Sequence, residues 1–235
     1  MDDRRQILDN VLRVQERIDA AARRVGRHSD EITLIGISKT QPAEAIRAAH
    51  EAGLRHFGEN RVQEWEGKRP ALADLQATWH LVGHLQSNKA ARAAGLFHSV
   101  DSVDDFSPAQ RLERARQEQA GATKLRVLIE VRVEEEENKS GVEPEEAAAL
   151  GRKLVEYTHL ELAGLMCIPP FLEDSGKVRP YFRRLRELRD SMTREIGHEL
   201  PVLSMGMSHD FEVAIEEGAT EVRVGTAIFG SRPAK

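Results

Sequence analysis

The chain alternates between two kinds of segment about eight times, and this alternation constrains its fold more than any other feature. Short runs rich in valine, isoleucine and leucine are followed by longer segments with apolar residues at helical spacing. Apolar runs joined through helices are typical of parallel strands that are covered on both faces. Eight such units in 235 residues predict a closed (β/α)8 TIM barrel, a single α/β domain over residues 1–235. A doubly wound open sheet is the alternative.

The expected strands are apolar, β-branched runs bounded by glycine, proline or polar turns. The fifth is the most regular, because apolar and charged residues alternate from Leu125 to Val133. Ser102 followed by Asp105 suggests a capping box that opens the helix after the fourth strand. The eight strands are expected at residues 32–37, 54–60, 78–83, 96–100, 125–133, 160–168, 202–205 and 221–224.

One segment precedes the first strand and lies outside the repeat. Residues 2–25 place apolar side chains three or four positions apart, which predicts an amphipathic helix. Gly26 is well placed to end this helix. We expect the segment 1–26 to pack on the barrel as an additional N-terminal helix.

The composition argues against several classes of protein. A net charge of −5 argues against a general nucleic-acid binder. The sequence has no apolar run long enough to cross a membrane, and its polar start lacks the apolar core of a signal peptide. A single cysteine, Cys167, excludes an internal disulfide and a cysteine-rich zinc site, and we expect it to be packed rather than reactive. We therefore expect a cytoplasmic protein without a metal site, and a monomer, since a barrel can bury its core alone.

Lys39 stands at the end of the first expected strand, residues 32–37, and shortly before Pro42. Proline suits the first position of a helix, so Lys39 lies where a strand passes into its helix. In α/β folds this is where the chemistry is carried out. Lys39 is either a solvated amine or a nucleophile, since enclosure among apolar groups lowers the pKa of an amine and makes it reactive toward an aldehyde. The stretch alone leaves both readings open.

Two turns near the end of the chain could bind an anion. Residues 204–208 follow the seventh strand, and Gly225 and Thr226 follow the eighth. Glycine lets backbone N–H groups approach a phosphate, and hydroxyl groups and a helix start add further donors. Each turn alone could be an ordinary cap, but their occurrence after adjacent strands favours a phosphate site. The carboxylates of Asp210 and Glu212 would have to point away from it.

Arg223 alternates with Val222 and Val224, which we expect to pack against outer helices, so Arg223 should point into the barrel. A buried arginine needs an acceptor. The acceptor is either a carboxylate, such as Glu130 or Glu221, or a ring nitrogen of a ligand. An amine, a phosphate site and an inward arginine together match pyridoxal 5′-phosphate, which carries an aldehyde, a phosphate and a pyridine nitrogen.

Eight short stretches in collinear order, between about Ile32 and Phe229, make the chain resemble a known family. They resemble the pyridoxal-phosphate homeostasis (pyridoxal-phosphate-binding) protein family, which is related to the N-terminal barrel of alanine racemase. Each stretch alone is weak, but together they are specific. The stretches are Ile37-Ser38-Lys39-Thr40, Phe57-Gly58-Glu59-Asn60, Trp79-His80-Leu81-Val82-Gly83, Leu85-Gln86-Ser87-Asn88-Lys89, Asn138-Lys139-Ser140-Gly141, Gly164-Leu165-Met166, Ser204-Met205-Gly206-Met207-Ser208 and Arg223-Val224-Gly225-Thr226-Ala227-Ile228-Phe229-Gly230.

The resemblance implies that Lys39 holds pyridoxal 5′-phosphate as an internal aldimine, a Schiff base. It implies that the phosphate lies among hydroxyl and backbone donors of the two late turns and that Arg223 faces the pyridine nitrogen. Lys139 matches a family lysine near the site, and His84 stands where many relatives have proline. The cofactor-binding residues expected in addition to Lys39 are Asn60, His80, Ser204, Met207, Ser208, Arg223, Gly225 and Thr226.

An arginine at the pyridine nitrogen would disfavour rapid amino-acid catalysis. It cannot accept a proton and disfavours the protonated ring, so the cofactor would be a weak electron sink. Racemisation also needs a second acid–base group, which in alanine racemase is a tyrosine outside this domain. The tyrosines of this chain, Tyr157 and Tyr181, lie on expected helices away from the strand ends.

The sequence therefore favours a carrier that buffers pyridoxal 5′-phosphate and delivers it to dependent apoenzymes, with no catalytic residue. A low-activity amino-acid racemase that uses the same site is the alternative. A third reading is an aldolase that forms a Schiff base on Lys39 with its substrate and needs no cofactor.

Overall fold

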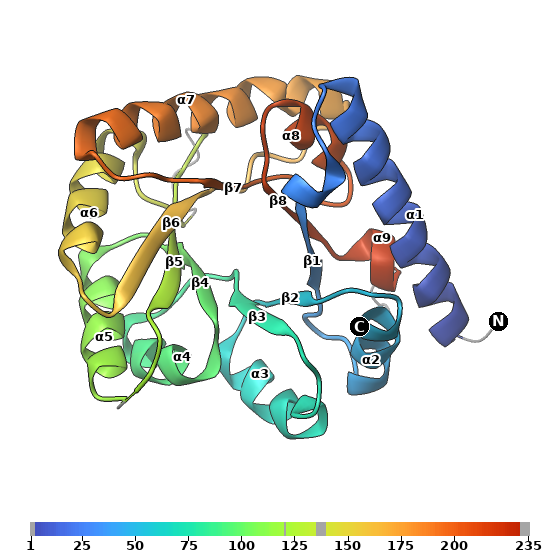
Figure 1. Ribbon diagram of the computed structural model, residues 1–235, viewed down its shortest axis with the longest axis horizontal. Helices are drawn as coiled ribbons and strands as arrows, with labels where there is room; N and C mark the ends of the chain where they lie inside the picture. Colours follow the sequence, from blue (N-terminus) through green and yellow to red (C-terminus); the bar gives the residue numbers. More distant parts are fainter. Residues whose placement is uncertain (1–2, 120, 135–139, 231–235) are drawn as a thin grey trace.

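The computed structural model describes residues 3–119, 121–134 and 140–230, and it contains a closed barrel of eight parallel strands (Figure 1). Each strand pairs with the next along the chain, and β8 pairs with β1. The predicted (β/α)8 fold is confirmed, and the open sheet is excluded. The strands are β1 (Thr33–Ile37), β2 (His56–Glu59), β3 (Thr78–Leu81), β4 (Ser99–Val103), β5 (Leu125–Glu130), β6 (Leu160–Met166), β7 (Val202–Ser204) and β8 (Glu221–Val224).

Helices surround the barrel and alternate with the strands (Figure 1). Four short 3-10 helices lie in the described connections: η1 (Ser29–Glu31), η2 (Arg69–Leu72), η3 (Ser87–Lys89) and η4 (Ser175–Val178). The α-helices are α1 (Asp3–Arg24), α2 (Ala43–Glu51), α3 (Val62–Lys68), α4 (Ala90–Leu96), α5 (Phe106–Gln117), α6 (Pro144–Glu156), α7 (Arg179–Ile196), α8 (Phe211–Glu216) and α9 (Thr226–Phe229).

The N-terminal helix α1 covers the seam between β8 and β1. Within residues 225–230, the described part of the chain after β8, the four-residue α9 is the only helix, and α1 occupies the position that a longer eighth helix has in a regular barrel (Figure 1). The side-chain amide of Asn10 donates to the carbonyl oxygen of Ile228 at 2.8 Å, which ties α1 to α9. As expected, the helix ends just before Gly26, whose φ is +70°. Its buried stripe is Ile7, Val11, Val14, Ile18, Ala21 and Ala22.

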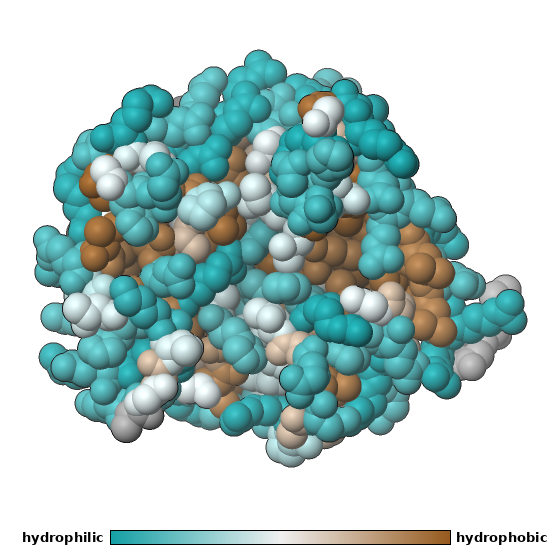
Figure 2. Space-filling model, viewed as in Figure 1, coloured by the Kyte–Doolittle hydropathy of each residue, from teal (hydrophilic) through white to brown (hydrophobic). Residues whose placement is uncertain are grey.

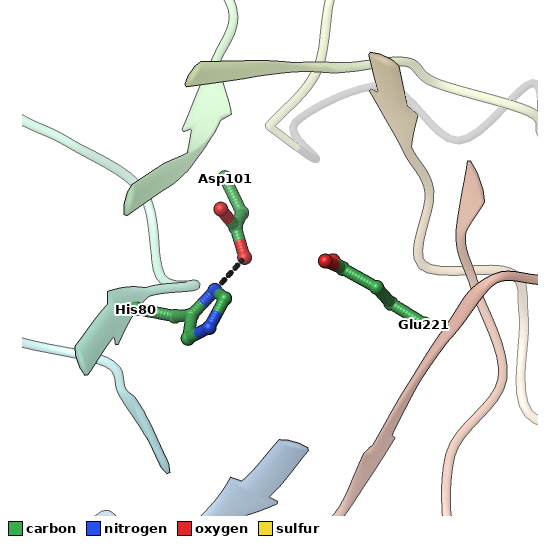
Figure 3. Close-up of side chains that lie close together, drawn as sticks. All are labelled: His80, Asp101 and Glu221. Carbon is green, nitrogen blue, oxygen red and sulfur yellow. Dashed lines mark hydrogen bonds and ion pairs between the residues drawn. The ribbon is translucent and has the colours of Figure 1, made fainter. Parts of the chain in front are cut away.

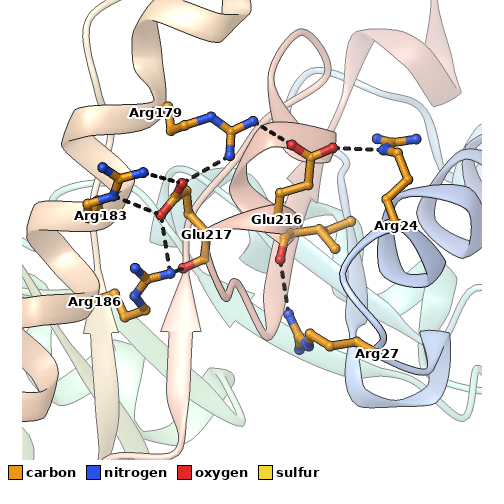
Figure 4. Close-up of polar contacts among 8 residues, drawn as sticks. Arg24, Arg27, Arg179, Arg183, Arg186, Glu216 and Glu217 are labelled. Carbon is orange, nitrogen blue, oxygen red and sulfur yellow. Dashed lines mark hydrogen bonds and ion pairs between the residues drawn. The ribbon is translucent and has the colours of Figure 1, made fainter.

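A cluster of ion pairs joins α1, α7 and α8 on the outer surface (Figure 4). Glu217, at the end of α8, has a side chain that is only 5% exposed and accepts from Arg179 at 2.9 Å and Arg183 at 3.1 Å. Glu216 binds Arg179 at 2.5 Å and Arg24 of α1 at 2.8 Å. These contacts hold the helices on either side of the β7–β8 region together.

Two expectations about local structure are wrong. The fourth strand begins at Ser99, three residues later than expected, because Leu96 still belongs to α4. Ser102 does not cap a helix: it lies in β4, and its hydroxyl donates to the carbonyl oxygen of Gly83 at 2.7 Å. Asp105 is the N-cap of α5 and accepts from the Ser107 N–H at 2.6 Å.

Figure 2 shows the hydropathy of one face of the molecule. The face seen in Figure 2 is mostly hydrophilic, and hydrophobic residues are visible mainly in the recesses between helices. In the part of the chain that the structure describes, none of the helices has the length and apolar character that crossing a membrane requires.

Candidate functional site

The candidate site lies where β1, β7 and β8 end, since these strands are neighbours in the closed barrel. Lys39 follows β1 in a tight turn and is half-buried. Gly225 follows β8 and packs against β1: a Cβ atom added there would lie 3.4 Å from Ile37 Cβ and 3.5 Å from the Ile37 carbonyl oxygen. The turn after β8 therefore touches β1 two residues before Lys39.

The hydroxyl oxygen of Ser208 accepts hydrogen bonds from two backbone N–H groups of the turn after β8. The N–H groups of Gly225 and Ala227 both donate to Ser208 Oγ, each at 3.2 Å. A hydroxyl that accepts two hydrogen bonds still has its own hydrogen to donate. The Ser208 hydroxyl hydrogen and the exposed hydroxyl of Thr226 are therefore the donors that this turn offers to a phosphate, and the two N–H groups become available when a phosphate oxygen replaces Ser208 Oγ as their acceptor. The contribution of Ala227 was not predicted from the sequence, because backbone groups carry no residue-type pattern.

The two acidic residues near this turn are engaged with other partners. Asp210 is buried and accepts from the Met207 N–H at 2.6 Å. Burial raises the pKa of Asp210. Glu212 forms an ion pair with Arg17 at 2.7 Å. Both carboxylates therefore have partners other than the hydroxyl of Ser208, and the Met207 N–H is used within its own turn.

Arg223 is buried inside the barrel, as its alternation with two valines predicts. Its guanidinium donates to Ser204 Oγ at 2.9 Å and to the Cys167 carbonyl oxygen at 2.7 Å. Among the described residues its hydrogen-bond partners do not include Glu130 or Glu221, the two carboxylates considered from the sequence. Ser204 accepts from the arginine and so fixes its direction, and its expected contact with the cofactor stays a prediction.

A buried carboxylate lies close enough to Arg223 to feel its charge. Burial raises the pKa of Glu130, and the positive charge of Arg223 opposes this rise. Glu130 Oε1 accepts from the Ser140 hydroxyl at 2.9 Å, but Oε2 has no hydrogen-bond partner among the described residues. An unpaired buried acceptor of this kind marks a place for a further donor. Nearby, full burial raises the pKa of the Cys167 thiol to about 12, which agrees with the expectation of a packed, unreactive cysteine.

Asn60 follows β2 and is half-buried near the same end of the barrel. Gly83 packs against its backbone: a Cβ atom at Gly83 would lie 2.3 Å from the Asn60 carbonyl oxygen. His84 is exposed and binds Asp104 at 3.1 Å. Lys139 lies outside the described residues.

His80, which the resemblance places at the cofactor pocket, has hydrogen-bond partners within the protein. It is buried inside the barrel, where its Nδ1 lies 2.9 Å from Asp101 Oδ2 and its Nε2 lies 3.0 Å from His56 Nδ1 (Figure 3). Both ring nitrogens are therefore engaged by protein groups, which leaves only ring carbons for a ligand.

The network around His80 continues across the barrel interior. Arg126 donates to Glu221 Oε1 at 2.5 Å and lies 3.8 Å from Asp101 Oδ1. His80, Asp101 and Glu221 place possible metal-ligand atoms within 4.8 Å of one another, and Figure 3 shows them facing a common space. Since Arg126 already supplies a positive charge there, we interpret the cluster as an internal ion-pair network.

The pKa values follow from this arrangement. Although burial acts to raise it, His80 and Arg126 hold the pKa of Asp101 below its ordinary value. Burial and the charge of Asp101 raise the pKa of Glu221. Burial lowers the pKa of His56 to about 4. Sequence reasoning missed this network, although Arg126 and Glu221 alternate with outward-facing apolar residues, and that alternation was a usable signal.

The residues that meet at the strand ends fit one kind of ligand well. The amine of Lys39 suits an aldehyde, the donors around Ser208 suit a phosphate, and the guanidinium of Arg223 suits a heterocyclic nitrogen. The contact of Gly225 with Ile37 brings the phosphate turn next to the strand that ends before Lys39. The donor set of this structure therefore fits pyridoxal 5′-phosphate.

Known proteins resemble this chain over nearly its full length. The model of the alanine racemase N-terminal domain matches residues 12–233. The pyridoxal phosphate homeostasis protein of Aquifex aeolicus (strain VF5) is 48% identical over 224 residues, which cover 95% of this chain and 97% of the relative. The protein of the same name from Escherichia coli (strain K12) is 41% identical over 231 residues, which cover 96% and 97%.

Solved structures give the same picture. PipY of Synechococcus elongatus PCC7942, solved with PLP bound, matches with a TM-score of 0.81 and 37% identity, over 92% of this chain and 100% of that chain. Alanine racemase from Corynebacterium glutamicum matches with a TM-score of 0.69 and 18% identity, over 96% of this chain and 62% of that chain, a likeness that shows the fold alone.

Proposed function

Because the chain belongs to the pyridoxal phosphate homeostasis protein family, within the alanine racemase N-terminal domain fold, we propose that it binds pyridoxal 5′-phosphate and serves the homeostasis of this cofactor. Lys39 holds the cofactor as a Schiff base. The observation that carries the proposal is the contact between the turn after β8 and the end of β1, which brings a phosphate-binding turn next to a lysine.

Each remaining site residue has a role in this proposal. Ser208 and the backbone of Gly225, Thr226 and Ala227 bind the phosphate, and Arg223 faces the pyridine nitrogen. Asn60 lies beside the cofactor, and Met207 shapes the same turn. His80 acts from within the barrel by packing, since both of its ring nitrogens are engaged.

The proposed role is storage and delivery rather than turnover. When bound, pyridoxal phosphate supplies an electron sink for amino-acid chemistry. A permanently charged arginine at the ring nitrogen weakens that sink, because it disfavours the protonated ring. Of the tyrosines, Tyr157 directly follows α6 on the side that leads into β6, and Tyr181 packs in α7 against the outer core. Neither placement supplies a second acid–base group at the strand ends.

The protein is proposed to act as a monomer in the cytoplasm and to pass the cofactor to dependent apoenzymes. The test is to load the protein with pyridoxal phosphate, remove free cofactor by gel filtration and mix it with an apoenzyme. We expect retention of about one cofactor per chain and recovery of the apoenzyme's activity. Failure to retain the cofactor would overturn the proposal, and catalytic exchange of amino-acid α-protons with deuterium would replace it with the racemase alternative.

A further inference from the structure

The backbone directly after Lys39 is strained. Thr40 has φ of +64°, in the left-handed region that β-branched residues rarely adopt. Such a conformation costs on the order of 1–3 kcal/mol and persists only where surrounding groups hold it. The turn that carries Lys39 therefore needs contacts that stabilise it.

Two side chains of α3 supply those contacts, one on each side of Lys39. Glu64 Oε1 accepts from the Thr40 N–H at 2.5 Å. Lys68 Nζ donates to the Ser38 carbonyl oxygen at 2.8 Å. Glu64 and Lys68 are one helical turn apart and form an ion pair at 2.6 Å. The two peptide groups that flank the Lys39 α-carbon are thus held by one pair of linked charges.

A buried carboxylate, that of Glu59, binds Lys68 and so holds the pair in place. Glu59, at the end of β2, has a fully buried side chain and accepts from Lys68 Nζ at 3.1 Å and from Ser38 Oγ at 2.7 Å. Lys68 is itself only 15% exposed. Charge-assisted hydrogen bonds between shielded groups are strong and directional, so the position of Lys68 is well defined. We call Glu59, Glu64 and Lys68 the α3 clamp.

We propose that Lys68 and Glu64 of the α3 clamp are positioning residues, which aim the side chain of Lys39 at the aldehyde of the cofactor. This inference rests on the proposed function. The Lys39 amine adds to the aldehyde carbon, and loss of one water leaves a C=N bond, with no oxidant or reductant. Fixing the two flanking peptide planes fixes the direction of the Lys39 Cα–Cβ bond. The turn is therefore already ordered when the cofactor arrives, and the amine can reach the aldehyde without a further change of the backbone.

The test compares two glutamates of the same helix. Glu64→Ala removes the acceptor that holds the Thr40 N–H. Glu66→Ala is the matched control, since Glu66 forms an ion pair with Arg92 away from the Lys39 turn. Stopped-flow absorbance measures the rate of Schiff-base formation after mixing each apo-protein with pyridoxal 5′-phosphate. We expect Glu64→Ala to slow this rate at least tenfold and Glu66→Ala to leave it within twofold.

A second ligand distinguishes a loss of Lys39 positioning from a general loss of structure at the binding site. Pyridoxine 5′-phosphate has an alcohol in place of the aldehyde, so it reports the phosphate and ring contacts without the bond to Lys39. We expect its affinity for Glu64→Ala to match that for the unchanged protein. Parallel losses for both ligands would show a merely structural role and overturn the inference.

Conservative variants complete the test. Glu64→Gln keeps an oxygen acceptor for the Thr40 N–H and Lys68→Arg keeps the charge, so both should restore most of the rate, whereas Lys68→Met should not. Equal rates for Glu64→Ala and the unchanged protein would overturn the inference and leave the proposed function intact. If the unchanged protein itself formed no Schiff base, the proposed function would fail first.

Discussion

At the scale of single residues, Arg223 is the group that we propose faces the pyridine nitrogen of the cofactor. It is held by Ser204 and by the carbonyl oxygen of Cys167, so its direction is set by the protein before any ligand binds. A fixed cation at the ring nitrogen lowers the proton affinity of that nitrogen. In the proposed complex, the fixed position of Arg223 therefore weakens the cofactor as an electron sink.

Replacing this arginine should change the bound cofactor in a defined direction. In Arg223→Glu we expect the ring nitrogen to bind a proton more readily, with more side reactions toward amino acids. A pH titration of the bound cofactor's absorbance measures this, with Arg223→Gln as the control that removes charge without adding a carboxylate beside Glu130. A titration identical to that of the unchanged protein would show that Arg223 does not contact the ring.

Some site residues could be predicted from the sequence and others could not, for a physical reason. Lys39, Ser208 and Gly225 follow predicted strands, so the sequence could place them at one end of the barrel, and their roles toward the cofactor stay predictions. Glu64 and Lys68 look like an ordinary helix-surface pair, and only the fold shows that they reach back to the Lys39 turn. Partners that are distant along the chain leave no local signature.

At the scale of elements, the ion-pair cluster of Glu216 and Glu217 holds α8 between α1 and α7 (Figure 4). Its centre is better shielded than most surface pairs, because the Glu217 side chain is 5% exposed. Shielded carboxylates with several arginine partners contribute more than exposed pairs do. We therefore expect this cluster to stabilise the outer layer measurably.

Removing the charge of Glu217 tests this expectation. Glu217→Gln should lower the free energy of unfolding by about 2 kcal/mol, since it leaves three arginines without their shared negative charge. Glu195→Gln is the control, because its pair with Arg152 is half-exposed and should be worth less than about 0.5 kcal/mol. Urea unfolding of both variants provides the comparison, and equal losses would contradict the account.

Element boundaries show where pattern reading fails. The eight-fold alternation predicted every strand, yet β4 was placed three residues early. Its inner face carries Ser99, which accepts from Arg126 of β5, and Asp101, which binds His80 of β3, so it lacks the apolar pattern of its neighbours. Ser102 was interpreted as a cap because of its spacing to Asp105, but its hydroxyl donates to the carbonyl oxygen of Gly83.

At the scale of the whole molecule, the barrel encloses a layer of charged and polar side chains beneath the candidate site. Buried histidines in such a layer make stability depend on pH. The pKa of His56 is lowered to about 4 in the folded protein by burial, from an ordinary value of 6.5. The unfolded chain therefore binds a proton at this residue at a higher pH than the folded chain does, and stability is lost as the pH falls from 6.5 toward 4.

The size of this effect can be measured against a variant. Between pH 7 and pH 5 the His56 contribution should lower the free energy of unfolding by roughly 2 kcal/mol. His56→Gln cannot take up the proton and should lack this share of the loss, so the stability difference between the two proteins should change by that amount. A difference that stays constant from pH 7 to pH 5 would show that His56 is not the titrating group.

The central claim is that Lys39 forms the bond to the cofactor, and one measurement tests it most directly. The protein is loaded with pyridoxal 5′-phosphate, reduced with borohydride, digested and mapped by mass spectrometry. We predict one labelled lysine, Lys39, and no retained label in Lys39→Ala, which should remain folded because the side chain is half-buried beside its turn. Label on another lysine of the unchanged protein, with Lys39 unmodified, would contradict the account.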